Sequence, residues 1–485
     1  MTTNPPSIKK NYIYNMAYRL LTIITPVITA PYISRVLGPD NIGIYSFTNA
    51  NVSYFILFGV FGLSSYSQLE CAKRRDDKEA FSQFCVESIL TRFLLMGISM
   101  SVYSYIFIFQ DNYYKFYYEL LLLSLLANLL DFTWICEGLE QYKTIALRNI
   151  VVKLLTVVSI LLFVNEASDL DVYVFIVTFS VLLGNLIIIP YARKYVVIRG
   201  IKRPNIKPHL KASLAYFLPS IASTIVSTAD KLMIGYFTCD MVQNGWYDQA
   251  TKISGIILTA FTSLCTTMRP RMAYLYTIKD HIKAEHYFYK ALSVSSFIAI
   301  PVCAGLIQVS DVFVPWFFGQ GYDGVVVLLQ IVAVWLLIRP FTNCLLELAI
   351  FCAGDISGIT RIIWLGAFFN VLLNIILIPQ LGALGAAIAS LTAEIPMLLY
   401  AMKLSKIELK FNHMKFDMIK EFMAASIMFL IMFVPKLYFE NETIEVLSMI
   451  ILGTSTYIVI AIGLRIPIVM ELTQGLKRKV GKSFE

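Results

Sequence analysis

Charged side chains inside long apolar segments are the residues of this sequence that could do chemistry. Arg19 shares helical spacing with Thr22 and Thr29, and Lys252 follows Asp248 by one helical turn. A charge at the centre of a membrane costs about 2.5–3.5 kcal/mol, so each one needs a partner, water or a function. The candidate cations are Arg19, Arg35, Lys153, Lys231, Lys252 and Arg339. The candidate carboxylates are Asp131, Asp230, Asp248 and Glu394.

These cations suit an anionic ligand. Guanidinium and ammonium groups donate several strong hydrogen bonds, and a diphosphate offers matching oxygens. Two bundles that turn such polar stripes inward would enclose a wet, cationic cavity. We therefore predict that the cations bind substrate. The carboxylates either couple transport to an ion, because buried carboxylates titrate near neutral pH, or pair with cations.

Some of these residues have a structural alternative. Arg35 lies near a helix end and could extend its charge to the membrane interface. The adjacent pair Asp230–Lys231 could neutralise itself. Lys153 could bridge to a carboxylate of the preceding segment, Asp131 or Glu137. The sequence leaves these alternatives open.

Signatures of catalysis are missing from the sequence. There is no G-x-x-x-x-G-K-[ST] phosphate loop and no G-x-S-x-G elbow. The four histidines are spaced too irregularly for a metal cluster: His209, His281, His286 and His413. We expect no enzyme activity, no metal or other cofactor and no nucleic-acid partner.

The elements that position the charges are membrane helices. Of 485 residues, 58% are hydrophobic and 15% are charged, against roughly 25% charged in soluble domains. Apolar runs of about 20 residues, enough to cross a bilayer, recur along the whole chain. We predict an all-α membrane protein with about fourteen spans: Tyr12–Val36, Ile42–Leu69, Phe84–Phe109, Tyr117–Glu137, Ile145–Val164, Asp171–Ala192, Ala212–Phe237, Trp246–Met268, Phe288–Val309, Val325–Phe351, Ile362–Ile378, Ala383–Lys403, Met418–Phe439 and Ile444–Leu464.

Basic residues orient these spans. They gather in alternate connections, such as residues 73–75 and 193–211, whereas the connections 38–41 and 240–244 carry none. By the positive-inside rule both termini are cytoplasmic, which requires an even number of spans.

The chain also looks doubled. Gly43-Ile44-Tyr45 opens the second span and Gly245-Trp246-Tyr247 opens the eighth. Six spans return the chain to the same side, so the repeats would be parallel, with substrate at their interface. We predict an N-terminal six-helix bundle at residues 1–207, a second at 208–412, and a further helix pair with a basic cytoplasmic tail at 413–485.

Several short motifs carry a family resemblance. They include Arg75-Asp76-Asp77-Lys78, Asp131-x-x-Trp134, Phe217-Leu218-Pro219, Asp230-Lys231-x-Met233 and Tyr247-x-Gln249-Ala250-x-Lys252. With these motifs the sequence resembles the Wzx-type polysaccharide-repeat-unit flippases, or O-antigen translocases. They form the polysaccharide branch of the multidrug/oligosaccharidyl-lipid/polysaccharide (MOP) exporter superfamily. The resemblance spans roughly residues 8–410, and the last helix pair adds little to it.

The resemblance implies a flippase that works by ion-coupled alternating access in the bacterial inner membrane. Its substrate would be an undecaprenyl-diphosphate-linked oligosaccharide, moved from the cytoplasmic to the outer leaflet for O-antigen or capsule synthesis. Polysaccharide polymerase or other assembly proteins would be partners besides the lipid bilayer. Two alternatives share the fold: a lipid II flippase, and a MATE-like exporter of drugs or metabolites.

Overall fold

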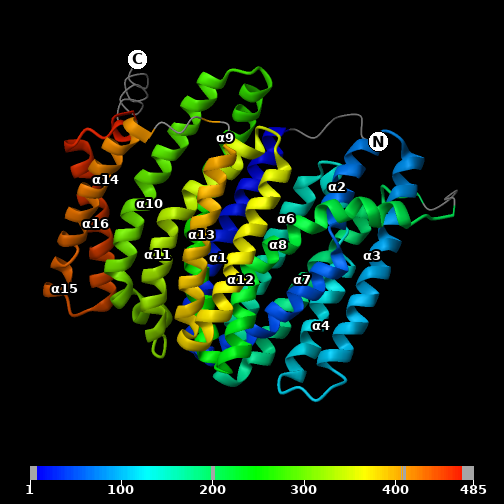
Figure 1. Ribbon diagram of the computed structural model, residues 1–485. Coiled ribbons are helices and arrows are strands. Elements are labelled where there is room, and N and C mark those ends of the chain that lie inside the picture. The colour runs from blue at the N-terminus through cyan, green and yellow to red at the C-terminus, as the bar shows by residue number, and fades with distance from the viewer. Residues whose placement is uncertain (1–7, 198–202, 406, 408–410, 472–485) are drawn as a thin grey trace. The chain divides into compact units, whose positions relative to one another are not determined.

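The structure is a computed structural model that describes residues 8–197, 203–405, 407 and 411–471, with all their side chains except those of residues 8–20, 23 and 411–414. All regular structure in these ranges is helical (Figure 1). Twelve of the described helices are long and apolar enough to cross a membrane. The predicted all-α membrane fold is therefore confirmed.

The chain divides into two compact units, which we call the first unit (Met1–Gly245) and the second unit (Trp246–Glu485). The first unit holds α1 (Ile8–Val60), α2 (Leu63–Arg74), α3 (Lys78–Phe107), α4 (Lys115–Leu129), α5 (Thr133–Gly138), α6 (Tyr142–Phe163), α7 (Leu170–Arg193) and α8 (Lys207–Thr238). The predicted bundle boundary at residue 207 follows the sequence repeat and stays a prediction.

The helices that follow belong wholly or mainly to the second unit. They are α9 (Met241–Thr277), α10 (His281–Phe318), α11 (Asp323–Cys344), the π-helical segment η2 (Leu345–Phe351), α12 (Ile356–Leu381), α13 (Ala383–Leu404), α14 (Phe411–Ile431), α15 (Val434–Tyr438) and α16 (Glu442–Gly463). A short 3₁₀ turn, η1 (Ala167–Asp169), precedes α7 in the first unit.

Two features explain why twelve apolar helices correspond to fourteen predicted spans. The segment Ile24–Arg74 counts once, although its 51 residues would extend roughly 77 Å as a straight helix, over twice the thickness of a bilayer's core. It contains two predicted spans, separated at Gly38, whose backbone is not helical (φ 77°, ψ 169°). The other feature is α9. It is long enough to cross a membrane, but it is not among the twelve apolar helices because it is more polar, and Asp248 and Lys252 lie on it.

Side-chain caps fix where several helices begin. Asp77 accepts hydrogen bonds from the backbone N–H groups of Glu79 and Ala80, both at 3.0 Å, and so starts α3 directly after the basic connection. Asn441 does the same for α16 through Thr443 and Ile444. Such caps satisfy N–H groups that the helix itself leaves unpaired.

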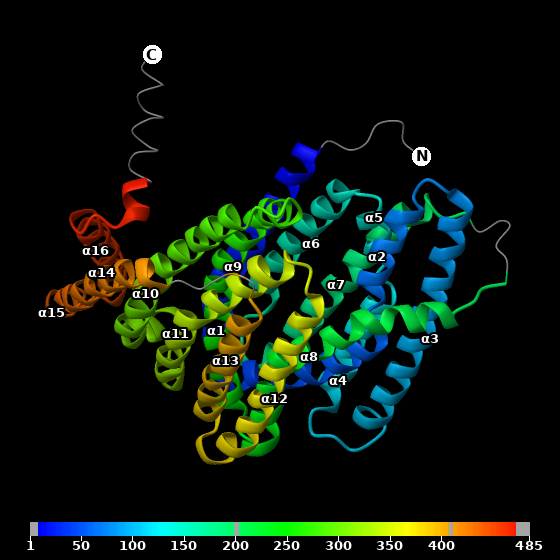
Figure 2. The ribbon, with the colours of Figure 1, turned by 45° about the horizontal axis from the view of Figure 1, so that its top comes forward.

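In the first unit, α1 packs against α3, α4, α6 and α8, and α7 packs against α4 and α6. In the second unit, α10 lies beside α11 and beside the pair α14 and α16, and α12 lies beside α13 (Figures 1 and 2). The faces that do not pack are apolar, as expected for helices in lipid. On α6, for example, Leu154, Leu155 and Leu162 are at least half exposed.

Candidate functional site

The predicted cations of α1 fall on different parts of that helix. The side chain of Arg19 lies outside the described residues. Arg35 is exposed, and it shares a helical face with Ile24 and Ile28, which are also exposed. Tyr32 ties this part of α1 to the end of α6, because its hydroxyl donates to the Val164 carbonyl at 2.7 Å. An apolar exposed face favours the alternative in which Arg35 extends to the interface.

Lys153 lies half-buried on α6. Its face also carries Thr156, whereas the exposed leucines of α6 point to the other side. Lys153 makes no hydrogen bond or ion pair with another described residue, so the suggested bridge to Asp131 or Glu137 does not form. Its ammonium group therefore keeps its donors available on a helix face turned away from the exposed leucines.

Asp131 pairs instead with Arg92, a residue that the sequence analysis missed. Arg92 lies on α3 with 2% of its side chain exposed, and its guanidinium is 3.7 Å from the Asp131 carboxylate. It also donates to the Asp131 carbonyl oxygen and, at 2.5 Å, to Ser64 on α2. The sequence signal was present: Arg92 stands at the middle of an apolar run, as the chosen cations do.

Arg148 shows a second polar contact inside the first unit. Its guanidinium donates to the Asn185 side chain on α7 at 3.0 Å, and Asn185 in turn donates to the Ala127 carbonyl at 2.7 Å. The residue thus joins α6 to α7 and to the end of α4.

The Asp230–Lys231 segment lies near the end of α8. Asp230 is buried, with 3% exposed, and Lys231 is half-buried. One and two turns before Lys231, Ser227 and Ser223 are exposed, so this face of a membrane-length helix is polar. Asn244, near the start of α9, donates to the Lys231 carbonyl at 2.8 Å and so joins α9 to α8. A face with exposed hydroxyl groups and a cation is suited to water or a polar ligand.

In the second unit the predicted charges form pairs. Lys252 on α9 lies 2.6 Å from Asp248, which is almost completely buried, while the lysine side chain keeps 38% exposed. Arg339 on α11 contacts both carboxylate oxygens of Glu394 on α13 at 3.3 Å. These contacts favour charge pairing for Asp248 and Glu394.

A further ion pair joins α9 to the π-helical segment. Arg269 donates to Glu347, and its guanidinium lies 5.0 Å from the centre of the Phe351 ring. π-helical turns inside α-helices are rare and occur often at functional sites. The described residues contain no group of three or more His, Cys, Asp and Glu side chains placed to hold a metal ion.

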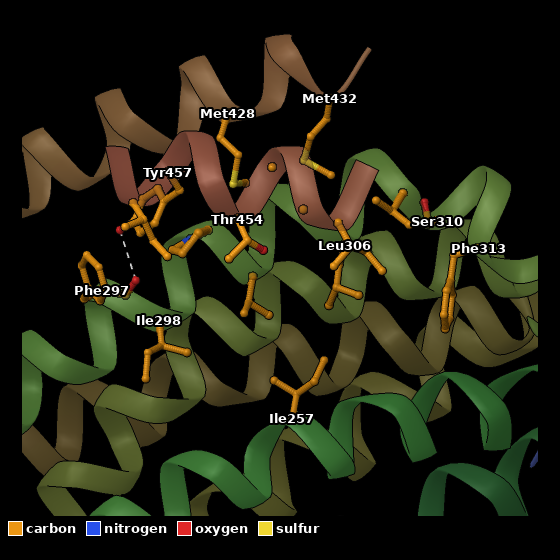
Figure 3. A pocket seen from close by; sticks show the side chains of 17 residues that line it. Ile257, Phe297, Ile298, Leu306, Ser310, Phe313, Met428, Met432, Thr454 and Tyr457 are labelled. Atoms are coloured by element: carbon orange, nitrogen blue, oxygen red, sulfur yellow. Dashed lines mark hydrogen bonds between the residues drawn. The ribbon is translucent and has the colours of Figure 1, made fainter. Parts of the chain in front are cut away.

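The second unit also contains an apolar cavity of about 440 Å³ (Figure 3). It is lined by α10, by α16, by the end of α14 and by Ile257 of α9, and Met428 and Met432 cover it from one side. Its polar lining is limited to Ser310, Thr454 and Tyr457. No charged side chain lines it, so it is not a site for a diphosphate.

Twelve described helices of membrane-crossing length and composition define a polytopic membrane protein. Residues 8–276 match the family described as "Polysaccharide biosynthesis protein". The match covers more than half of the chain, and the chain belongs to this family.

Two curated relatives have the same description, "Putative O-antigen transporter". The relative from Escherichia coli (strain K12) is 24% identical over 343 residues, which are 69% of this chain and 81% of that protein. The relative from Shigella dysenteriae is 21% identical over 406 residues, 82% of this chain and all of that protein. Together with the family match they confirm the predicted resemblance to the polysaccharide branch of the MOP superfamily.

Solved structures agree on the fold. The chain is similar to "Lipid II flippase MurJ, inward closed conformation", with a TM-score of 0.71 and 17% identity, over 94% of this chain and 98% of that one. It is also similar to a "multidrug resistance MATE family transporter of the MOP superfamily" in its inward-facing conformation, with a TM-score of 0.61 and 16% identity, over 79% and 94%. At these identities the likeness shows the MOP flippase fold alone.

Proposed function

We propose that this protein is a flippase of the bacterial inner membrane that moves undecaprenyl-diphosphate-linked oligosaccharide repeat units from the cytoplasmic to the outer leaflet. The supporting observation is the presence of cations on polar, partly exposed faces of membrane-length helices, in a chain of the polysaccharide biosynthesis family. The product would be O-antigen, capsule or another surface polysaccharide. A polymerase would receive the flipped unit as its substrate.

The headgroup of such a lipid poses one physical problem. A diphosphate in hydrocarbon without partners costs far more than the membrane insertion of any helix residue. Lys153 and Lys231 offer donors for phosphate oxygens from two helices that both pack against α1. Lys252, on α9, keeps part of its side chain exposed despite its pair with Asp248. In this proposal these cations bind the diphosphate while the polyprenyl chain stays in lipid, and transport proceeds by alternating access, as the family resemblance implies.

The carboxylates divide between the two predicted roles. The geometry supports charge pairing for Asp131, Asp248 and Glu394, because each has a cation beside it. Asp230 is buried on α8 and is followed by Lys231 in the chain, so both ion coupling and charge pairing stay open for it in this proposal.

A complementation test addresses this function. A bacterium without its own repeat-unit flippase, supplied with the cognate repeat-unit genes, should regain surface polysaccharide with the wild-type chain. Lys153→Ala should lower the polysaccharide roughly ten- to hundredfold, because a charged hydrogen bond is worth about 1.5–3 kcal/mol. Lys143→Ala, at the exposed start of the same helix, is the matched control and should behave as wild type.

The alternatives predict other outcomes. If the wild type is folded in the membrane but restores nothing with its cognate genes, the repeat-unit proposal is wrong. Rescue of a strain depleted of its lipid II flippase would then favour that activity. Resistance to cationic drugs in a hypersensitive strain would favour an exporter.

A further inference from the structure

A buried acidic residue, Glu421, lies outside the site described above. It belongs to α14, which packs against α10 and α16 in the second unit (Figure 1). Only 1% of Glu421 is exposed, and Ala424, Ala425 and Met428 on the following turns of the helix are equally buried. The carboxyl group therefore points into the contact between three helices, away from both water and lipid.

The hydrogen bonds around Glu421 leave its carboxyl group short of donors. Its one side-chain hydrogen bond is with Ser296 on α10, and its Oε2 atom is buried without a partner among the described residues. A hydroxyl group has a single proton to donate. The Ser293 carbonyl is a second acceptor for the same hydroxyl group at 3.1 Å, so the single Ser296 proton is shared between that carbonyl and Glu421.

A second hydroxyl group near Glu421, that of Tyr457, donates its proton to another acceptor. Tyr457 on α16 lies close enough to Glu421 to interact electrostatically, and it donates to the Phe297 carbonyl on α10 at 3.1 Å (Figure 3). The Tyr457 proton thus goes to a backbone carbonyl of α10, and Ser296 is the only other hydroxyl group described beside Glu421.

No ion pair joins Glu421 to a described cation. Lys420 precedes it on α14 but points about 100° away around the helix, whereas Asp417, one turn earlier on the same face, is itself acidic. On α10, Lys290 pairs with Glu471. The buried residues of α16 are apolar apart from Tyr457. An ionised carboxylate buried without a partner is so costly that the group takes up a proton instead.

We propose that Glu421 is a proton-binding site of the transport cycle. It holds a proton while α14 packs against α10 and α16, and it exchanges that proton with water when the packing loosens. The proton comes from water on one side and returns to water on the other, so no further reactant is needed. The role in transport rests on the proposed flippase function, whereas the bound proton does not.

Infrared spectroscopy of the purified full chain tests the bound proton without any substrate. At neutral pH the wild type should show the C=O stretch of a protonated carboxyl group that Glu421→Gln lacks. Glu440→Gln removes an exposed carboxylate from the neighbouring loop and should keep the band. Glutamine has the shape of the protonated acid, so the variant should fold. Identical spectra for folded wild type and Glu421→Gln would overturn the proposal.

Reconstituted vesicles test the role in transport. A pH gradient should accelerate movement of the lipid-linked oligosaccharide by the wild type and by Glu440→Gln, and it should have at least fivefold less effect on Glu421→Gln. Equal acceleration of all three would refute the role of Glu421 in coupling. If the wild type moves no substrate, the flippase proposal fails, and the infrared spectra still decide whether Glu421 binds a proton.

Discussion

At the scale of single residues, intramembrane charges in this protein are of two kinds. Arg92 is enclosed by Asp131, Ser64 and backbone carbonyls, whereas Lys153 has no partner among the described residues. The sequence marks both as costly charges, but only three-dimensional contacts distinguish a structural charge from an available one. Arg92 and Glu421 carried the same sequence signal as the chosen charges, a charge within a predicted span, but were not selected.

Replacing Arg92 should destabilise the fold. Arg92→Met leaves Asp131 unpaired, and loss of one partner of a buried pair costs about 3–5 kcal/mol. The midpoint of thermal unfolding, followed by size-exclusion chromatography of heated samples, should fall clearly. Arg75→Ala removes an exposed ion pair with Glu140 and should shift it little. Equal midpoints for Arg92→Met and wild type would show that the pair contributes nothing.

Variants of the Lys252–Asp248 pair can distinguish a role of Lys252 in stability from a role in substrate binding. Lys252→Ala leaves a buried carboxylate and should lower both thermal stability and transport. The double variant Lys252→Ala/Asp248→Ala should recover the stability, because no uncompensated charge remains. Transport should stay low if Lys252 contacts substrate. Recovery of transport together with stability would show that Lys252 acts only by pairing with Asp248.

At the scale of elements, the sequence predicted where helices run better than how they join. Every predicted span lies mainly on helical residues, but the predicted spans Ile42–Leu69, Tyr117–Glu137 and Met418–Phe439 each run over two helices of the structure. The predicted break between Val36 and Ile42 is present as a kink inside α1, because the backbone of Gly38 is not helical and Pro39 follows it. The short helices α5 and α15 were predicted as parts of longer spans, because hydropathy does not detect a break of a few residues between two helices.

Gly43 should be intolerant of any side chain. A Cβ atom there would lie 1.7 Å from the Met241 carbonyl oxygen, which is a backbone atom and cannot rotate away. Gly43→Ala should therefore cost at least about 1–3 kcal/mol and reduce the amount of folded protein in the membrane. Gly97→Ala on α3, where a Cβ meets nothing within 4 Å, should be neutral or stabilising. Normal folding and transport by Gly43→Ala would contradict this tight contact.

At the scale of the whole molecule, composition and charge distribution already predicted a polytopic, all-helical membrane protein. Residue motifs predicted its family, and the family match confirms it. The roles of the predicted site residues could not be derived in the same way. Whether Arg35 or Lys231 faces lipid, protein or water depends on helix rotation, and a span of apolar residues with one charge fixes no rotation. The structure adds the neighbours on each helix face, which are exposed serines beside Lys231 on α8 and exposed isoleucines beside Arg35 on α1.

The central claim is that this chain moves a lipid-linked oligosaccharide across a bilayer and leaves it chemically unchanged. The most direct measurement uses the purified protein in vesicles that carry the lipid-linked repeat unit on the inner leaflet only. A lectin added outside reports the sugar that reaches the outer leaflet, and mass spectrometry reports its structure. The account predicts that the lectin binds an unaltered repeat unit with wild type, and at least tenfold more slowly with Lys153→Ala. Sugar that stays inside with folded wild-type protein, or that appears outside only as an altered product, would contradict it.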